Sequence, residues 1–136
     1  MTMSNLHPGF ILIAVGLIAL FVPKSLRRPV LAAGPLLGLG AVLTLAPGTN
    51  ATLPFINGIT LHYLHVDALS WIFALIFCMM AAIGGIYACH NSNRMEAFCS
   101  MTYAGSALGV TLAQDWLTLI FFSELMAATS LFLIWC

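Results

Sequence analysis

The chain has 136 residues, of which 62% are apolar and only 6% charged, with four basic side chains balancing four acidic ones. A soluble domain carries about 25% charged residues to cover its surface. This composition therefore excludes an ordinary soluble protein and indicates an outer surface that faces lipid. The balanced charge and an isoelectric point near 6.9 also argue against nucleic acid as a partner.

Five apolar segments succeed one another along the chain, and each is predicted to form a transmembrane helix. Segments of about 16–24 residues suit a hydrocarbon core of about 30 Å, because a helix rises about 1.5 Å per residue. Lipid cannot bond free backbone polar groups, so helices are required. The expected fold is an all-α, polytopic membrane protein, with segments at about 7–22, 30–45, 66–89, 97–113 and 115–136.

A single membrane domain is expected to fill residues 1–136. Its first two helices lie in 1–47, a polar outer loop with Pro and Gly lies in 48–65, and the third to fifth helices lie in 66–136. The first ten residues contain no Lys or Arg, so a cleaved signal peptide is not expected.

Basic residues are confined to two connections between the segments. Lys24, Arg27 and Arg28 lie between the first and second segments, and Arg94 lies between the third and fourth. With five spans, both connections fall on the same side of the membrane. The positive-inside rule makes that side cytoplasmic, so the N-terminus is expected outside and the C-terminus in the cytoplasm.

The residue types that can ligate metals are scattered along the chain. His62 and His65 are three apart and could share a face of a helix, but no further ligand is near them, and a His pair in a polar loop is more often solvated than metal-bound. No CxxC pair occurs, so the four cysteines are expected to be thiols buried as small apolar groups: Cys78, Cys89, Cys99 and Cys136. We predict neither a metal site nor a bound cofactor.

Small residues recur at intervals of four within the apolar segments. Gly34 and Gly38 form one such pair, and Gly105 and Gly109 form another. The third segment repeats the spacing with Ala81 and Gly85 and with Gly84 and Ala88. Small residues at this interval let helix backbones approach closely in lipid, so these positions are predicted to pack against other helices.

Two acids begin helices near the outer interface. Asp67 precedes the third segment and Asp115 precedes the fifth. A helix dipole favours an acid at this end, so both are expected to cap their helices, with a supporting role in transport as the alternative. Glu96, beside Arg94 at the inner interface, is expected to be solvated.

Glu124 lies about ten residues into the fifth segment, a depth of about 14 Å. A charge at the centre of the membrane costs about 2.5–3.5 kcal/mol on insertion scales. No Lys or Arg of the chain is placed to neutralise it, so Glu124 is either protonated or paired with a cation from elsewhere. Both states make it the candidate proton carrier. The alternative is a neutral carboxyl that is simply hydrogen-bonded to Ser123, Thr129 or a backbone carbonyl.

The neighbours of Glu124 suggest close helix packing. Ser123, Ala127 and Ser130 form a narrow stripe of small residues beside the carboxyl. Such a stripe is typical of a helix contact, which would hold Glu124 inside a bundle.

Two sequence stretches match known motifs in order and spacing. Residues 114–126 read QDWLTLIFFSELM and residues 65–73 read HVDALSWIF. They resemble GDLLTLFVFWELM and xLDGLSxxF of the antiporter-like subunits found in respiratory complex I, Mrp-type cation/proton antiporters and membrane-bound hydrogenases. Residues 103–110, YAGSALGV, resemble the family's fourth helix, and 128–135 are similar to the D-type branch of the Mrp antiporters.

The resemblance covers about Leu61 to Cys136 and implies that Glu124 is part of a proton path. In the family this glutamate pairs with an intramembrane lysine about two helices later. The implied partners are therefore other membrane subunits, including one that supplies such a lysine and the remaining antiporter helices. Ser123 departs from the family, which has a bulky aromatic residue before the glutamate. The resemblance also implies a bacterial or archaeal cytoplasmic membrane and an N-terminus outside.

The expected function is that of a short or split subunit of a multisubunit complex that translocates protons, alone or coupled to sodium. Two alternatives stay open: a structural assembly subunit, and a small channel built by homo-oligomerisation. The chain has no phosphate-binding loop and no nucleophile–base spacing, so no catalytic centre of its own is expected. Redox chemistry, if any, would belong to a partner.

Overall fold

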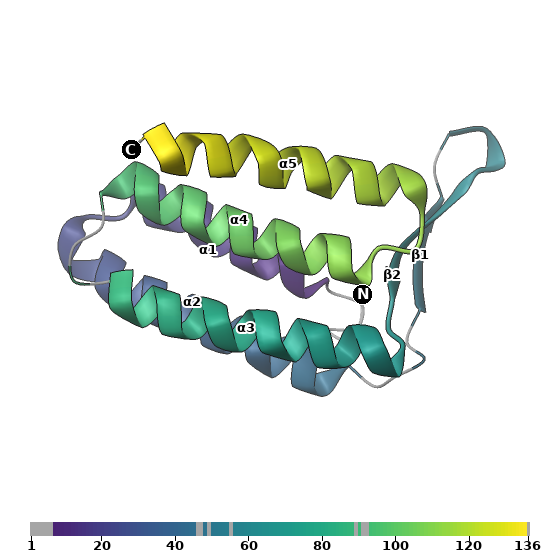
Figure 1. Cartoon of the computed structure of the whole chain (residues 1–136), viewed down its shortest axis with the longest axis horizontal. Coiled ribbons are helices and arrows are strands. Elements are labelled where there is room, and N and C mark those ends of the chain that lie inside the picture. The colour runs from purple at the N-terminus through teal and green to yellow at the C-terminus, as the bar shows by residue number, and fades with distance from the viewer. Residues whose placement is uncertain are drawn as a thin grey trace.

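In the described part of the computed structural model, five α-helices run back and forth along a common axis (Figure 1). The structure describes residues 7–45, 48, 50–54, 56–88, 90 and 93–135. The helices in this part are α1 Pro8–Phe21, α2 Lys24–Thr44, α3 Ala68–Ala88, α4 Arg94–Leu112 and α5 Trp116–Trp135. The expected all-α architecture is confirmed.

Three of these helices are long and apolar enough to cross a membrane: α2, α3 over Ala68–Tyr87, and α5. The apolar helix α1 has only 14 residues, which span about 21 Å. α4 has 19 residues, but Arg94 and Glu96 stand in its first turn. The three apolar helices indicate a membrane protein, as the composition predicts.

Two helices begin earlier than their apolar patterns predict. α2 starts at Lys24, after Pro23 in the N-cap position, rather than near residue 30. α4 starts at Arg94 rather than near residue 97. Lys24, Arg28 and Arg94 are exposed in these first turns. A helix can continue past the hydrocarbon into the headgroup region, where such side chains stay hydrated, so the apolar segment is shorter than the helix.

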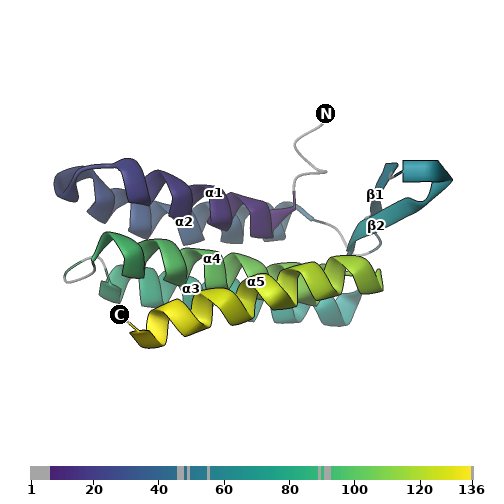
Figure 2. The ribbon, with the colours of Figure 1, turned by 90° about the horizontal axis from the view of Figure 1, so that it is seen from above.

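The helices form two layers, with α1 and α2 in one and α3, α4 and α5 in the other (Figure 2). Helix α4 is the most central, because it contacts α1, α3 and α5. Its buried side includes Thr102 and Ser106, whose hydroxyl donates to the Thr102 carbonyl oxygen at 2.7 Å. Shielding by three neighbouring helices explains how α4 carries more polar and small residues than the others.

The four glycines predicted to pack against helices all meet neighbours within this chain. A β-carbon on Gly105 would stand 2.6 Å from the carbonyl oxygen of Gly9 in α1, and the same holds in reverse. A β-carbon on Gly34 would stand 2.4 Å from Val15. Gly38 lies against Leu12 in ordinary contact, and Gly109 lies against Phe122. These glycines therefore join α4 to α1, α2 to α1, and α4 to α5.

A β-hairpin connects α2 to α3 where an irregular loop is expected from the sequence. Strand β1, Asn50–Pro54, pairs antiparallel with β2, Thr60–His65. Within the intervening 3-10 turn, Asn57 and Gly58 have φ of 62° and 81°. Asn-Gly favours this conformation and is the sequence signal for a hairpin. His62 and His65 both lie on β2, so they do not share a helical face.

Two of the four cysteines lie within the described residues, Cys78 in α3 and Cys99 in α4, and both are buried as expected. The prediction for Cys89 and Cys136 falls outside the described residues.

Between α3 and α2, the indole nitrogen of Trp71 donates to the carbonyl oxygen of Val42 at 3.1 Å. This bond fixes α3 against the end of α2 that leads into the hairpin.

Candidate functional site

Helix α5 presents one face to the bundle and the opposite face to its surroundings. Its buried side chains are Thr118, Phe122 and Thr129. Glu124 follows Phe122 by two residues, which is about 200° around a helix of 3.6 residues per turn. Its carboxyl therefore lies on the exposed face.

This placement corrects the expectation that the small-residue stripe holds Glu124 inside the bundle. Ala127 is exposed, and Ser123 and Ser130 are only partly buried. The bulky Phe122, rather than the stripe, makes the contact with α4, because Gly109 leaves room for its ring. The stripe is thus open to whatever surrounds the chain.

Glu124 lies close to the middle of α5. It stands eight residues after Trp116 and eleven before Trp135 (124 − 116 and 135 − 124), about 12 Å and 16 Å along the helix. Both tryptophans are 83% exposed. Tryptophan is enriched at the two membrane–water interfaces, so this pair is spaced as interfacial anchors on either side of the acid.

No hydrogen bond or ion pair of Glu124 occurs within the described part of the chain. The nearby hydroxyls donate to backbone carbonyls instead: Ser123 to Ile120 at 3.0 Å and Thr129 to Leu125 at 2.9 Å. The alternative of a carboxyl held by a serine or threonine proton therefore finds no support in this geometry.

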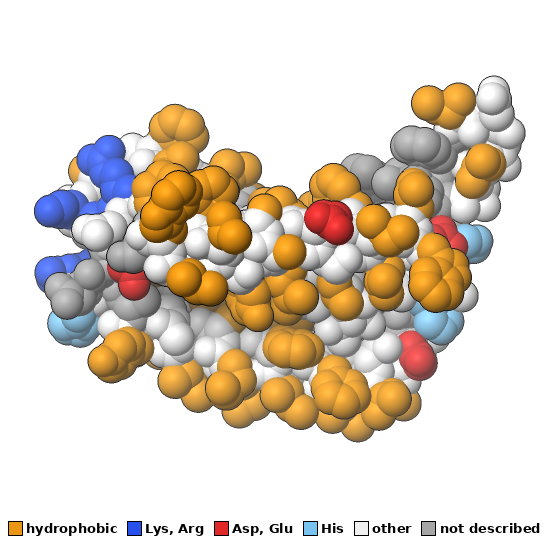
Figure 3. Space-filling view, turned by 45° about the horizontal axis from the view of Figure 1, so that its top comes forward, with side chains coloured by type: hydrophobic (Ala, Val, Ile, Leu, Met, Phe, Trp, Pro, Cys, Tyr) orange, Lys and Arg blue, Asp and Glu red, His pale blue; other side chains and the backbone are white. Residues whose placement is uncertain are grey.

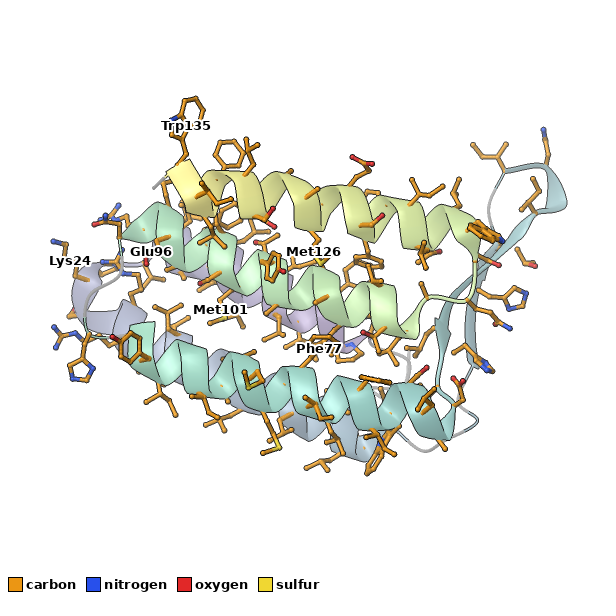
Figure 4. The ribbon with its side chains drawn as sticks, in the orientation of Figure 1. Lys24, Phe77, Glu96, Met101, Met126 and Trp135 are labelled. Atoms are coloured by element: carbon orange, nitrogen blue, oxygen red, sulfur yellow. The ribbon has the colours of Figure 1, made fainter. Side chains whose placement is uncertain are left out.

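Lysine and arginine side chains gather at the end of the bundle opposite the hairpin (Figure 3). Lys24, Glu96 and Trp135 mark this end in Figure 4. Glu124 is about eleven residues of helix away from it, so none of these cations stands beside the carboxyl. The structure thus keeps the basic residues at one end, as their positions in the two connections require.

Asp115 ties the hairpin to the start of α5. Its carboxylate accepts a hydrogen bond from the backbone N–H of His62 in β2. Its own carbonyl oxygen accepts from the N–H of Leu119, in the first turn of α5, at 2.9 Å. Asp115 therefore begins the helix as expected, but its side chain bridges two segments 53 residues apart instead of capping α5.

Asp67 lies at the same end of the molecule, directly before α3. Its carboxylate oxygen is 3.8 Å from Nε2 of His65, an ion pair when the imidazole is protonated. Its carbonyl oxygen accepts from the N–H of Trp71 at 2.9 Å. Asp67, Asp115, His62 and His65 thus lie at the hairpin end of the bundle, and Asp115 is about 14 Å along the helix from Glu124.

His7 is a buried group that the sequence does not single out. Its Nδ1 accepts from the backbone N–H of Gly9 at 3.0 Å and so caps α1. Its ring stacks on Phe122, with centroids 5.5 Å apart, and meets the edge of Phe10. His7 thus joins the start of α1 to the buried aromatic residue of α5.

Arg27 is a second buried group, although its position in a basic cluster predicts a solvated topology signal. It is only 4% exposed, and its Nη1 has no hydrogen-bond partner among the described residues. The helical position could have revealed this, since Arg27 precedes the buried Leu31 by one turn.

The described residues contain no group of three His, Cys, Asp or Glu side chains placed to hold a metal ion. What the arrangement offers chemically is one protonatable carboxyl in the middle of an apolar helix, open to a partner on its exposed face. Comparison of the chain with protein-family models, with curated proteins and with solved structures finds no match.

Proposed function

We propose that this chain is a subunit of a multisubunit membrane complex that translocates protons, and that Glu124 is its proton-carrying residue. The observation that carries the proposal is the position of this carboxyl, at mid-helix on the exposed face of α5. An ionised carboxylate at this position is costly in lipid. A role in exchanging a proton with a partner group would account for an acid at such a position. The resemblance of residues 114–126 to the antiporter-like motif supports the same role.

The exposed face of α5 supports the need for a partner. Glu124 must meet either lipid or another protein, because no group of the described chain bonds to it. A membrane helix that brings a lysine to this face would neutralise the carboxylate and complete a proton-transfer pair. In this proposal all five helices cross a bacterial or archaeal cytoplasmic membrane. The basic end faces the cytoplasm and the hairpin faces outward.

The proposal is tested by Glu124→Gln, which removes the titratable proton and keeps the shape of the side chain. Glu96→Gln, at the basic end, is the matched control. Proton uptake is measured with a pH-sensitive dye in membrane vesicles that contain the assembled complex. We expect Glu124→Gln to lower transport at unchanged complex content and Glu96→Gln to leave transport intact. Normal transport by Glu124→Gln would contradict the proposal.

The structural alternative is an assembly subunit with no transport role. It gains one specific point of support, namely that the exposed stripe of Ser123, Ala127 and Ser130 is available for close contact with another helix. In that case Glu124→Gln is silent, while Ala127→Leu removes the chain from its complex. Purification of the tagged chain from its native membrane distinguishes both versions from a channel made of copies of this chain alone.

A further inference from the structure

An apolar groove lies between α3 and α4, and Met126 of α5 also lines it. Its volume is about 520 Å³. Phe77, Met101 and Met126, labelled in Figure 4, line it from the three helices. A dry apolar cavity of about 150 Å³ already holds a molecule as large as benzene. This groove therefore has room for a substantial length of hydrocarbon chain.

The groove exists because several residues that line it have small side chains. Gly84 and Ala81 contribute from α3, and Ala104 and Ala107 from α4. A β-carbon on Gly84 would meet nothing within 4 Å, so this glycine borders empty space rather than a helix contact. Within a bilayer such a space is filled by the surrounding hydrocarbon, since water is excluded from it.

One end of the groove lies near the end of the bundle where the basic side chains gather. Ser100 and Met101 line this end, and they follow Arg94 on the same helix by six and seven residues, about 10 Å. Arg94, Lys24 and Arg28 are exposed at that end. Against these charges the described acids contribute only Glu96 there (Figures 3 and 4). The excess of positive charge beside an apolar groove is complementary to a lipid with an anionic headgroup.

We propose that this groove binds an acyl chain of an anionic phospholipid, whose headgroup lies against Arg94 and the neighbouring basic side chains. The apolar walls hold the hydrocarbon and the basic end selects the headgroup. The site is separate from Glu124, which lies on the opposite side of α5 from Met126 (about 200° around the helix). Lipid binding and proton transfer therefore respond to different substitutions.

The test is native mass spectrometry of the purified chain in detergent with added phosphatidylglycerol or phosphatidylcholine of identical acyl chains. We expect the wild type to retain phosphatidylglycerol preferentially. Gly84→Phe fills the groove and removes the bound lipid. Gly40→Phe is the matched control, because a β-carbon at this α2 glycine also meets nothing within 4 Å. It should retain lipid as the wild type does, and Gly84→Leu replaces Gly84→Phe if the latter does not fold.

The headgroup is tested by Arg94→Gln. We expect it to keep a lipid in the groove but to lower the preference for phosphatidylglycerol about fivefold, the effect of one basic residue near a membrane surface. Equal retention of both lipids by the wild type, or unchanged retention by Gly84→Phe, would overturn the proposal. So would a photoreactive residue at Met80 that crosslinks another polypeptide instead of lipid in native membranes.

Discussion

The ring of Phe122 occupies the space that a side chain at position 109 would need. Phe122 is a buried aromatic residue of α5, and a β-carbon built on Gly109 would stand 2.4 Å from two atoms of its ring. The same ring packs on His7, so a single phenylalanine joins α5 to α4 and to the start of α1. The position of Glu124, two residues further along α5, therefore depends on the fit between Phe122 and Gly109.

We predict that Gly109→Ala destabilises the fold by about 1–3 kcal/mol, the usual cost of overpacking. The measurement is unfolding of the chain in detergent by heat or denaturant. Gly40→Ala is the control, because its β-carbon meets open space and alanine gains up to about 1 kcal/mol over glycine in a helix. Phe122→Leu should partly rescue Gly109→Ala, since the obstacle is a side chain. Equal stability of the two alanine variants would contradict the prediction.

The sequence predicts the order of the helices and the central position of Glu124, because both follow from apolar lengths that lipid imposes. It does not predict which face Glu124 occupies. The small residues Ser123 and Ala127 suggest that their face of α5 is buried. In the structure Phe122 makes the contact with α4 instead, because Gly109 leaves space for its ring. The face of α5 that contacts α4 depends on the fit between side chains of both helices, so the periodicity of α5 alone does not reveal it.

The burial of Arg27 and the docking of the hairpin both depend on contacts between segments that are far apart in the sequence. Arg27 is buried on the face of α2 that also buries Leu31, although its charge suggests solvent. The hairpin has a local signal in Asn57-Gly58, but its attachment to Asp115 joins residues 53 apart. The expectation of a polar loop overlooked this local turn signal, and the docking of the hairpin follows only from the assembled structure.

We predict that Asp115→Ala releases the hairpin from the start of α5. The backbone N–H of His62 loses its carboxylate acceptor, so its hydrogen exchange should become faster. Asp115→Asn keeps an oxygen acceptor and should retain most of the protection. Asp67→Ala is the control, because its carboxylate faces His65 and not the His62 amide. Hydrogen-exchange mass spectrometry of the peptide over 60–65 measures the effect, and unaltered exchange in Asp115→Ala would refute it.

We predict that Glu124 reacts with a hydrophobic carbodiimide when the chain stands alone in a bilayer. Such reagents partition into hydrocarbon and modify protonated carboxyls, and this carboxyl lies at mid-helix on an exposed face. Peptide mass spectrometry should find the adduct at Glu124 but not at Asp67, which lies in water outside α3 and calls for a water-soluble carbodiimide. In the native complex, a partner helix over α5 should protect Glu124 from the reagent. Labelling that is equally fast in both preparations would mean that no protein covers this face, and the partner would have to be sought elsewhere on the chain.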